Sequence, residues 1–315
     1  MIVDDPLTDE LDFERPSLVV EMSALAGAFQ SAPLGRSISI PGKYGSYDIT
    51  TLLTETFQSK IFLGVSDTGM EVVIKQYLQE KVETNSFGFE REEFFHSHLF
   101  SRGGYPNTIE AREFIRYQDR LLSVSPFVRG RNLEEFITRQ GSIPAPDVVS
   151  LIKPLSRLIH YLHSLGGVHR DIKPSNVMLT WPKSGIVVPL LFDFGISWHP
   201  ELARYDKPGM LYATPAYMPP EKWDYPTPDR REDIFSLAVM TYEMLSGELP
   251  FYVENFDDLY AKHRQKAAVP DLCELTPFVS PKMSAVVKKG MAYDPCERYQ
   301  TAAEFGNALA EANRK

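Results

Sequence analysis

The sequence has few cysteines, no long hydrophobic run and no surplus of basic residues. Its 315 residues include only Cys273 and Cys296, too few for a disulfide framework, and no Cys/His cluster has the spacing of zinc ligands. No apolar stretch approaches the roughly 20 residues of a membrane-spanning helix, and the acidic N-terminus lacks the basic start of a secretory signal. The net charge of −9 disfavours a nucleic-acid partner. We therefore expect a soluble, cytoplasmic protein without a membrane span.

What the chain does contain is enough apolar material for a sizeable core, since hydrophobic residues make up 43% and aromatic residues 12%. Residues 1–46 differ from the rest because they are rich in acidic residues, prolines and small residues. We expect an N-terminal extension here, either a flexible leader or a segment that docks on the domain and regulates it. Within it, residues 17–29 have the pattern of a short amphipathic helix.

From Tyr47 the sequence turns to short runs of β-branched and aromatic residues, separated by turn signals such as Asp67 and Gly69. Three of these runs predict an antiparallel meander, and two more predict strands that follow a helical stretch. Together they indicate a small, mostly β unit. The predicted strands are 47–53, 59–66, 71–78, 112–118 and 120–127, and the predicted helix is 89–99.

The rest of the chain has the pattern of helices. Asn132 and Glu135 have the spacing of a capping box. Apolar residues recur at helical spacing in 148–165, where Pro154 lies in the first turn or at a kink. Residues 233–247 are apolar almost all round, which is typical of a helix in the centre of a domain. The sequence therefore predicts an α+β protein.

Two motifs, HRDIKPSN at 169–176 and DFG at 193–195, contain the residues suited to catalysis. Phosphoryl transfer requires one carboxylate to orient a hydroxyl, a carboxylate and an amide to hold Mg²⁺, and a cation to offset the migrating charge. The two motifs supply this set in one short stretch of sequence. Its members are Asp171, Asp193, Asn176 and Lys173.

The order and spacing of these motifs resemble the eukaryotic-type (Hanks-type) serine/threonine protein kinase family, and the compact chain is similar to its bacterial branch. The resemblance implies a two-lobed protein kinase fold over residues 47–312, with a small β-rich N-lobe (47–128) and a larger helical C-lobe (129–312). It implies transfer of the γ-phosphate of ATP to Ser or Thr of a protein substrate, including autophosphorylation, with Mg²⁺ or alternatively Mn²⁺. The oligomeric state is left unknown.

The resemblance assigns a role to each residue of the two motifs. Asp171 would accept the proton of the substrate hydroxyl, and Lys173 would offset charge on the phosphoryl group. Asn176 and Asp193 would ligate the metal. Thr214, in the segment ATPAYMPPE, would bond to Asp171 and Lys173, which favours a Ser or Thr acceptor.

A second lysine lies in the predicted strand VVIK, which resembles the family's VAIK motif. Lys75 would bind the α- and β-phosphates and pair with a glutamate of the following helix, where the family pattern favours Glu92. Val73 stands where the family usually has alanine and would crowd the nucleotide pocket without closing it. The other two candidate glutamates are Glu90 and Glu93.

The largest departure from the family lies in the phosphate-binding loop, where Thr54, Thr56 and Ser59 replace the glycines of G-x-G-x-x-G. Glycine lets backbone N–H groups approach phosphate and permits positive φ. We therefore predict nucleotide affinity weaker by about 1–2 kcal/mol, although the three hydroxyls could donate to phosphate. The remaining nucleotide contacts implied by the resemblance are Ile61, Val73, Lys75, Met178 and the hinge residues Pro126 and Val128.

Arg170 precedes the aspartate of the catalytic loop, and in the family this arginine often receives a phosphate from the activation segment. No Ser or Thr lies between Trp198 and Tyr212. We therefore predict that Arg170 pairs with Glu201 or Asp206 and that the segment is largely preset.

Other structural roles are implied by the resemblance. Glu221 would form a buried ion pair with Arg298, and Asp233 would hold the backbone of the catalytic loop. Ser125, at the gatekeeper position beside the hinge, would leave a back pocket open.

Two other functions stay open. A pseudokinase or scaffold with weak nucleotide binding would explain the missing glycines and Val73. A small-molecule or lipid kinase on the same fold is disfavoured by the peptide-binding signature ATPAYMPPE.

Overall fold

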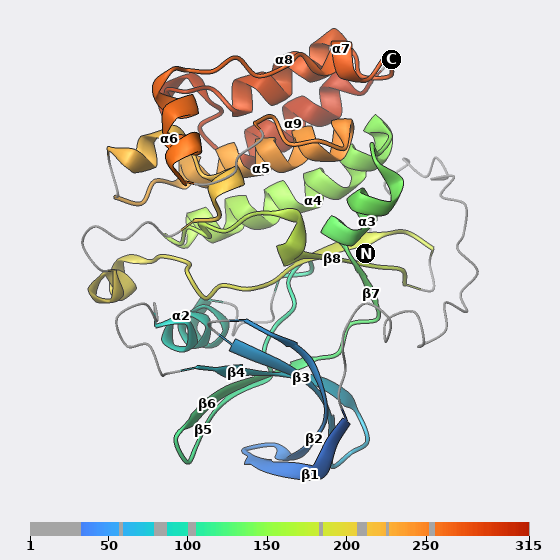
Figure 1. Cartoon of the computed structure of the whole chain (residues 1–315), viewed down its shortest axis with the longest axis vertical. Coiled ribbons are helices and arrows are strands. Elements are labelled where there is room, and N and C mark those ends of the chain that lie inside the picture. Colours follow the sequence, from blue (N-terminus) through green and yellow to red (C-terminus); the bar gives the residue numbers. More distant parts are fainter. Residues whose placement is uncertain are drawn as a thin grey trace, which may run out of the picture.

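The structure, a computed structural model, describes residues 33–56, 59–78, 87–99, 105–182, 185–206, 213–224, 227–251 and 256–314. A small lobe built on a β-sheet lies against a larger helical lobe (Figure 1), which confirms the predicted α+β, two-lobed fold. Among these residues no helix is both long and apolar enough to cross a membrane. The helix predicted at 17–29 falls outside them.

The sheet of the small lobe is antiparallel throughout, in the order β1-β2-β3-β4-β6-β5. Side chains alternate between its two faces, and one face forms a core that includes Ile49, Phe62 and Ile74. The strands are β1 (Pro33–Gly42), β2 (Gly45–Glu55), β3 (Ser59–Ser66), β4 (Glu71–Tyr77), β5 (Glu113–Tyr117) and β6 (Arg120–Pro126).

Strand β1 lies inside the stretch 1–46 that we expected to be an extension ending in a loop. It pairs with β2, with Ile40 opposite Tyr47, and Ile40 is only 2% exposed in the core of the lobe. The SISI alternation has the period of a strand, whereas the PGKYG that follows has the composition of a loop. The sheet therefore begins at Pro33.

Helix α2 (Gly88–Phe94) lies beside the sheet, on the side of the small lobe nearest the helical lobe (Figure 1). It continues into a π-helical turn, Phe95–Leu99, within what we predicted as one helix. Such turns are frequent at functional sites. Here Phe95 stacks on Phe194 of the DFG motif with the ring centroids 5.6 Å apart, so the turn joins α2 to that motif.

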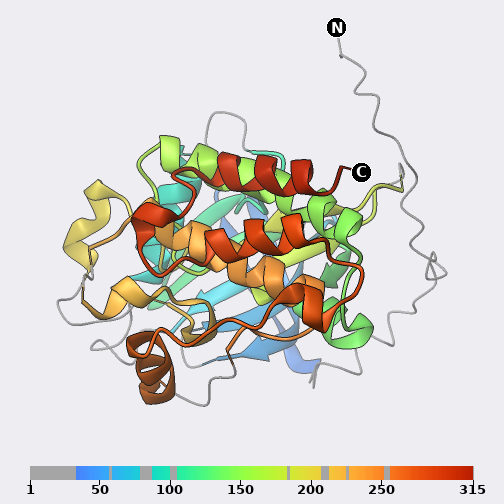
Figure 2. The same cartoon turned by 90° about the horizontal axis from the view of Figure 1, so that it is seen from above.

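Helix α5 (Arg230–Ser246) runs through the centre of the large lobe and is buried on nearly all sides. A capping box between Asp229 and Glu232 fixes its start, and Gly247, with φ at 79°, ends it. Figure 2 shows the helices of this lobe lying in front of the strands. They are α3 (Leu133–Gln140), α4 (Ala145–Ser164), α6 (Phe256–Arg264), α7 (Leu272–Leu275), α8 (Pro281–Gly290) and α9 (Ala302–Ala312).

A second sheet positions the two motifs. Its strands are β7 (Gly130–Asn132), β8 (Val177–Thr180) and β9 (Val188–Leu191), in the order β7-β8-β9. Strand β8 follows the catalytic loop directly, and β9 ends just before the DFG motif. Val177, at the start of β8, is paired with Leu191, at the end of β9. Asn176 and Asp193 therefore lie beyond the same end of these two strands.

Two local expectations differ from the structure. Pro154 lies well inside α4, because this helix begins at Ala145, and so it is not in the first turn. The side chain of Asn132 caps the start of α3, but it accepts from the N–H of Glu134 at 2.9 Å instead of forming the expected capping box with Glu135. Its amide group, however, donates to the carbonyl of Ser175 at 2.7 Å, and so the cap also holds the catalytic loop.

Candidate active site

Asp171 is the centre of the catalytic loop. Its Oδ1 accepts a hydrogen bond of 2.6 Å from Thr214. Its Oδ2 accepts from Nδ2 of Asn176 at 2.9 Å and lies 2.9 Å from Nζ of Lys173. Lys173 also donates to Oγ1 of Thr214 at 2.8 Å. Three of the predicted site residues therefore meet at the carboxylate of a fourth.

Asp233 of α5 anchors this loop to the core. Its carboxylate accepts hydrogen bonds of 2.8 Å from the N–H groups of His169 and Arg170, and lies 2.8 Å from Nε2 of His163. Arg170 has a φ of 69°, a strained value for a residue other than glycine, and these bonds hold it there. Burial alone would raise the pKa of Asp233, but its contact with His163 lowers it, so the carboxylate stays charged.

Lys75 on β4 joins the small lobe to the DFG motif. Its Nζ donates to Glu92 of α2 and, at 2.9 Å, to Oδ1 of Asp193. Of the candidate glutamates, Glu92 therefore makes this pair, whereas Glu93 binds Arg116. Burial alone would lower the pKa of Lys75, but the charges of Asp193 and Glu92 hold it well above its ordinary value. Lys75 is thus an ammonium at neutral pH.

Tyr77 belongs to this cluster, although sequence reasoning did not single it out. Its hydroxyl donates to Oε2 of Glu92 at 2.7 Å and lies 3.1 Å from Oγ of Ser123. Phe89 of α2 packs edge-to-face against its ring. Tyr77 lies two residues after Lys75 in one strand, so alternation puts both on one face. That spacing is the signal that could have revealed it.

Asn176 and Asp193 supply oxygen atoms suited to a metal. Nδ2 of Asn176 is used by Asp171, which leaves Oδ1 as the atom able to ligate a cation. Burial alone would raise the pKa of Asp193, but Lys75 lowers it below its ordinary range. A carboxylate and an amide oxygen fit Mg²⁺. Among the described residues no group of three or more His, Cys, Asp and Glu side chains is placed to hold a metal ion.

Ile61 and Val73 lie on the face of the small-lobe sheet that carries Lys75. Ile61 is paired with Lys75 between β3 and β4, and Leu63 is paired with Val73. All four are half-buried, whereas the residues that alternate with them, such as Phe62, point into the core. Leu63 is a further apolar residue of this face that the sequence analysis did not name.

The chain passes from the small-lobe sheet to the second sheet between Pro126, which ends β6, and the start of β7. Val128 lies in this connection and is half-buried. Ser125, the predicted gatekeeper, is paired with Val73. Met178 lies on β8 and is also half-buried. The predicted hinge residues thus lie at the junction of the two lobes.

The loop between β2 and β3 is closed by its own polar groups. The N–H of Thr56 donates to the carbonyl of Ser59 at 2.8 Å, and the N–H of Ser59 donates to Oγ1 of Thr56 at 3.1 Å. Ser59 is buried, whereas Thr54 is exposed at the end of β2. The N–H groups at two positions where the family has glycine are therefore bonded within the loop and are not free to bind a ligand.

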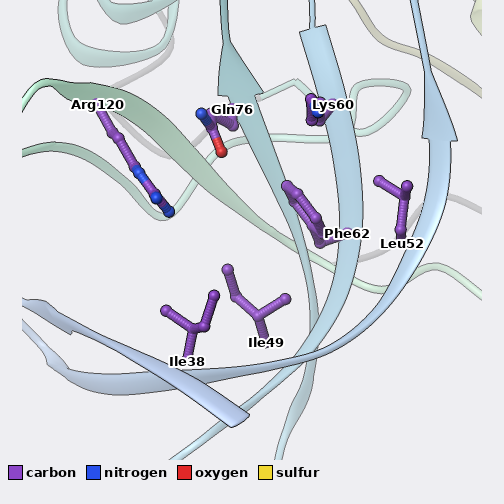
Figure 3. A pocket seen from close by; sticks show the side chains of 7 residues that line it. All are labelled: Ile38, Ile49, Leu52, Lys60, Phe62, Gln76 and Arg120. Carbon is purple, nitrogen blue, oxygen red and sulfur yellow. The ribbon is translucent and has the colours of Figure 1, made fainter. Parts of the chain in front are cut away.

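A cavity of about 270 Å³ lies on the opposite face of this sheet. Phe62 and Gln76 line it, and both alternate with residues of the Lys75 face. Figure 3 shows its polar side chains together at one end. Because the cavity lies on the face opposite Lys75, it is separate from the catalytic residues. Its lining consists of Ile38, Ile49, Leu52, Lys60, Phe62, Gln76 and Arg120.

Two ion pairs fix the segment that follows the DFG motif. Arg298 is buried and donates to both carboxylate oxygens of Glu221, at 2.7 and 2.6 Å. Arg170 pairs with Asp206 at 2.6 Å, which is one of the two carboxylates we predicted. The other, Glu201, is exposed.

Comparisons with known proteins identify the family to which the chain belongs. Residues 53–308 match the family model described as the protein kinase domain. The chain is 31% identical over 192 residues to the probable serine/threonine-protein kinase PknB of Corynebacterium glutamicum, covering 59% of this chain and 29% of that protein. It is also 31% identical over 210 residues to the serine/threonine-protein kinase PknJ of Mycobacterium tuberculosis, covering 66% of this chain and 35% of that protein. The chain thus spans about a third of the length of these curated relatives.

The crystal structure of a double mutant of the Mycobacterium tuberculosis PknI kinase domain is similar, with a TM-score of 0.66 and 19% identity over 89% of this chain and 99% of that chain. At this identity the likeness shows the fold alone, and the fold is the predicted one. The family model covers most of the chain, and the relatives are bacterial serine/threonine kinases. This chain therefore belongs to the protein kinase domain family, on the side of its bacterial serine/threonine members.

Proposed function

We propose that the chain transfers the γ-phosphate of ATP to Ser or Thr side chains of a protein, its own included. The observation that supports this most strongly is the convergence of Thr214, Lys173 and Asn176 on the carboxylate of Asp171. A carboxylate fixed at three points can align a hydroxyl with a phosphorus atom, and the adjacent ammonium can offset negative charge.

In the proposed reaction Asp171 accepts a hydrogen bond from the substrate hydroxyl and takes its proton as the oxygen attacks the γ-phosphorus. The new oxygen–phosphorus bond forms while the bond to the β–γ bridging oxygen breaks, and ADP leaves. Lys173 and Lys75 stabilise the charge that spreads over the phosphoryl oxygens. Thr214 keeps Asp171 and Lys173 in contact.

We propose that ATP is held between the two sheets, with Asn176 and Asp193 ligating Mg²⁺ or Mn²⁺. When bound, the metal neutralises phosphate charge and orients the γ-phosphate. The half-buried side chains of the Lys75 face and of β8 supply an apolar surface for the adenine, and the connection between the lobes supplies backbone polar groups. The residues in question are Ile61, Leu63, Val73, Met178, Pro126 and Val128.

A scaffold that binds nucleotide weakly is a second candidate, and one observation favours it. Because Thr56 and Ser59 bond to each other, their loop has fewer N–H groups to offer phosphate. The charged residues argue for catalysis instead, since Lys75 contacts Asp193 and Lys173 contacts Asp171. An enzyme with weakened nucleotide affinity accommodates both observations.

The test is phosphate transfer from γ-labelled ATP, with Mg²⁺, to an unstructured protein rich in Ser and Thr. Wild type is compared with Asp171→Asn and with Asp224→Asn, a control at an exposed ion pair. We expect wild type and control to label Ser or Thr, as mapped by mass spectrometry, and Asp171→Asn to be slower by about 10²–10⁴-fold. Equal and negligible rates, with ATP still bound, would favour the scaffold.

We further propose that the kinase unit includes strand β1, so that it extends over residues 33–312 rather than 47–312, because this strand completes the small-lobe sheet. A cytoplasmic setting, where ATP and protein substrates are both supplied, is part of the same proposal.

A further inference from the structure

The carboxylate of Asp206 lies between two arginines that come from distant parts of the chain. Arg170 of the catalytic loop donates to Oδ1 at 3.2 Å and to Oδ2 at 2.6 Å. Arg91 of α2 donates to Oδ1 at 2.6 Å. Asp206 itself follows the 3-10 turn Pro200–Tyr205, in the segment after the DFG motif. One side chain thus joins three elements, and we call these three residues the Asp206 clamp.

Each arginine of the clamp is the chain neighbour of a proposed site residue. Arg91 directly precedes Glu92, the partner of Lys75. Arg170 directly precedes Asp171. The clamp therefore fixes the residues next to two carboxylates of the site, Glu92 and Asp171.

The clamp is buried and charged. The side chains of Arg91 and Arg170 are 0% and 1% exposed, and that of Asp206 is 24% exposed. Guanidinium groups buried to this extent require a counter-charge. Burial alone would raise the pKa of Asp206, but the hydrogen bonds and charges of Arg170 and Arg91 lower it, so the carboxylate remains ionised.

A phosphate on a Ser or Thr of the segment 193–221 would be another source of such charge. Ser197 and Thr214 are its only Ser and Thr residues. Ser197 is fully buried and donates to the carbonyl of His169 at 3.1 Å, and Thr214 donates to Asp171. A phosphate on either hydroxyl would break a contact that holds the catalytic loop.

We propose that Asp206 is a positioning residue whose carboxylate permanently holds α2 and the catalytic loop in register, so that this chain needs no phosphate on its activation segment. A phosphate would have to be added by a separate reaction, whereas a carboxylate is part of the sequence. The consequence for the reaction rests on the proposed function, but the clamp itself is a structural claim that can be tested without it.

Three variants separate charge from shape. Asp206→Asn keeps the size of the side chain and removes its charge, Asp206→Glu keeps the charge, and Asp224→Asn is the matched control at an exposed pair with Arg264. Each chain is treated with a broad-specificity phosphatase, its unphosphorylated mass is verified, and kcat and the KM for ATP are measured.

Treated wild type and Asp224→Asn should keep the full rate. Asp206→Asn should lose about tenfold or more in kcat, the size expected for losing charge-assisted hydrogen bonds, with little change in KM. Asp206→Glu should recover most of the rate.

Amide hydrogen exchange gives a readout independent of activity. Exchange in α2 and in residues 168–173 should be faster in Asp206→Asn, and unchanged in Asp224→Asn, at a temperature where all the chains are folded. Unchanged exchange in Asp206→Asn would overturn the clamp, as would a wild type that loses its rate on phosphatase treatment. If no chain transfers phosphate even before treatment, the proposed function fails, and hydrogen exchange still decides the clamp.

Discussion

Tyr77 donates a 2.7 Å hydrogen bond to Oε2 of Glu92, on the same carboxylate whose Oε1 accepts from Lys75. Both residues are buried, one on β4 and the other on α2. The tyrosine therefore restricts the orientation of the carboxylate that in turn holds the ammonium. Helix α2 is tied to the sheet through a polar contact as well as through the packing of Phe89 on the tyrosine ring.

We predict that Tyr77→Phe lowers the rate of phosphate transfer about tenfold and the free energy of unfolding by about 1 kcal/mol. The ring and its packing remain, but Glu92 loses one of its two fixed contacts. Steady-state kinetics and urea unfolding measure the two effects. Tyr44→Phe, at an exposed tyrosine, serves as the control and should change neither. A Tyr77→Phe chain with the wild-type rate would show that Lys75 alone positions Glu92.

The buried pair of Glu221 and Arg298 predicts a large effect on stability. In Glu221→Gln the guanidinium of Arg298, which has no exposed side-chain surface, loses its counter-charge. We expect the free energy of unfolding to fall by about 3–5 kcal/mol. The exposed pair of Asp224 and Arg264 provides the comparison, since Asp224→Asn should change the free energy of unfolding far less. Urea unfolding measures both variants, and equal losses in their free energies of unfolding would contradict this expectation.

The closed turn of the phosphate loop predicts weak binding of ATP. Replacing both Thr56 and Ser59 by glycine removes the hydroxyl contacts between them and lets the backbone approach phosphate, so we expect ATP affinity to improve about tenfold. Thr68→Gly, in the turn between β3 and β4, should leave affinity unchanged. Isothermal titration provides the measurement. Submicromolar binding by the wild-type chain would mean that the turn does not weaken nucleotide affinity.

Local patterns predicted much of this structure because they depend on neighbours in sequence. Strand β3 has the predicted bounds, 59–66, since its alternation of buried and half-buried side chains is a property of the strand itself. The contacts of Lys173 and Asn176 with Asp171 also join residues a few positions apart. Motif spacing alone brings such residues together.

Contacts between distant segments could not be predicted in the same way. Glu201 and Asp206 were equally suitable partners for Arg170, and the choice depends on a 3-10 turn that leaves Glu201 exposed and turns Asp206 inward. Nothing around Arg91 in the sequence indicates that it reaches the same carboxylate. The sheet also has an edge strand, β1, that was not predicted, because the sequence of this strand contains residues typical of loops.

His263 makes stability depend on pH. It is buried in the large lobe, and Nε1 of Trp223 donates to its Nδ1 at 3.0 Å. Burial, together with the charge of Arg298, lowers the pKa of His263 to about 4. An unfolded histidine has a pKa of about 6.5, so as the pH falls the unfolded state binds this proton first. The contribution of the neutral His263 to the free energy of unfolding is therefore complete above about pH 6.5. It is lost as the pH falls toward 4, at up to about 1.4 kcal/mol per pH unit.

We therefore predict that His263→Gln, whose amide oxygen can still accept from Trp223, makes the loss of stability between about pH 6.5 and 4.5 shallower than in wild type. His160→Gln, at an exposed position of α4, should leave the slope unchanged. Urea unfolding at a series of pH values compares the three chains, and groups common to all of them cancel in the comparison. Identical slopes for wild type and His263→Gln would mean that this histidine is protonated as easily in the folded chain as in the unfolded one.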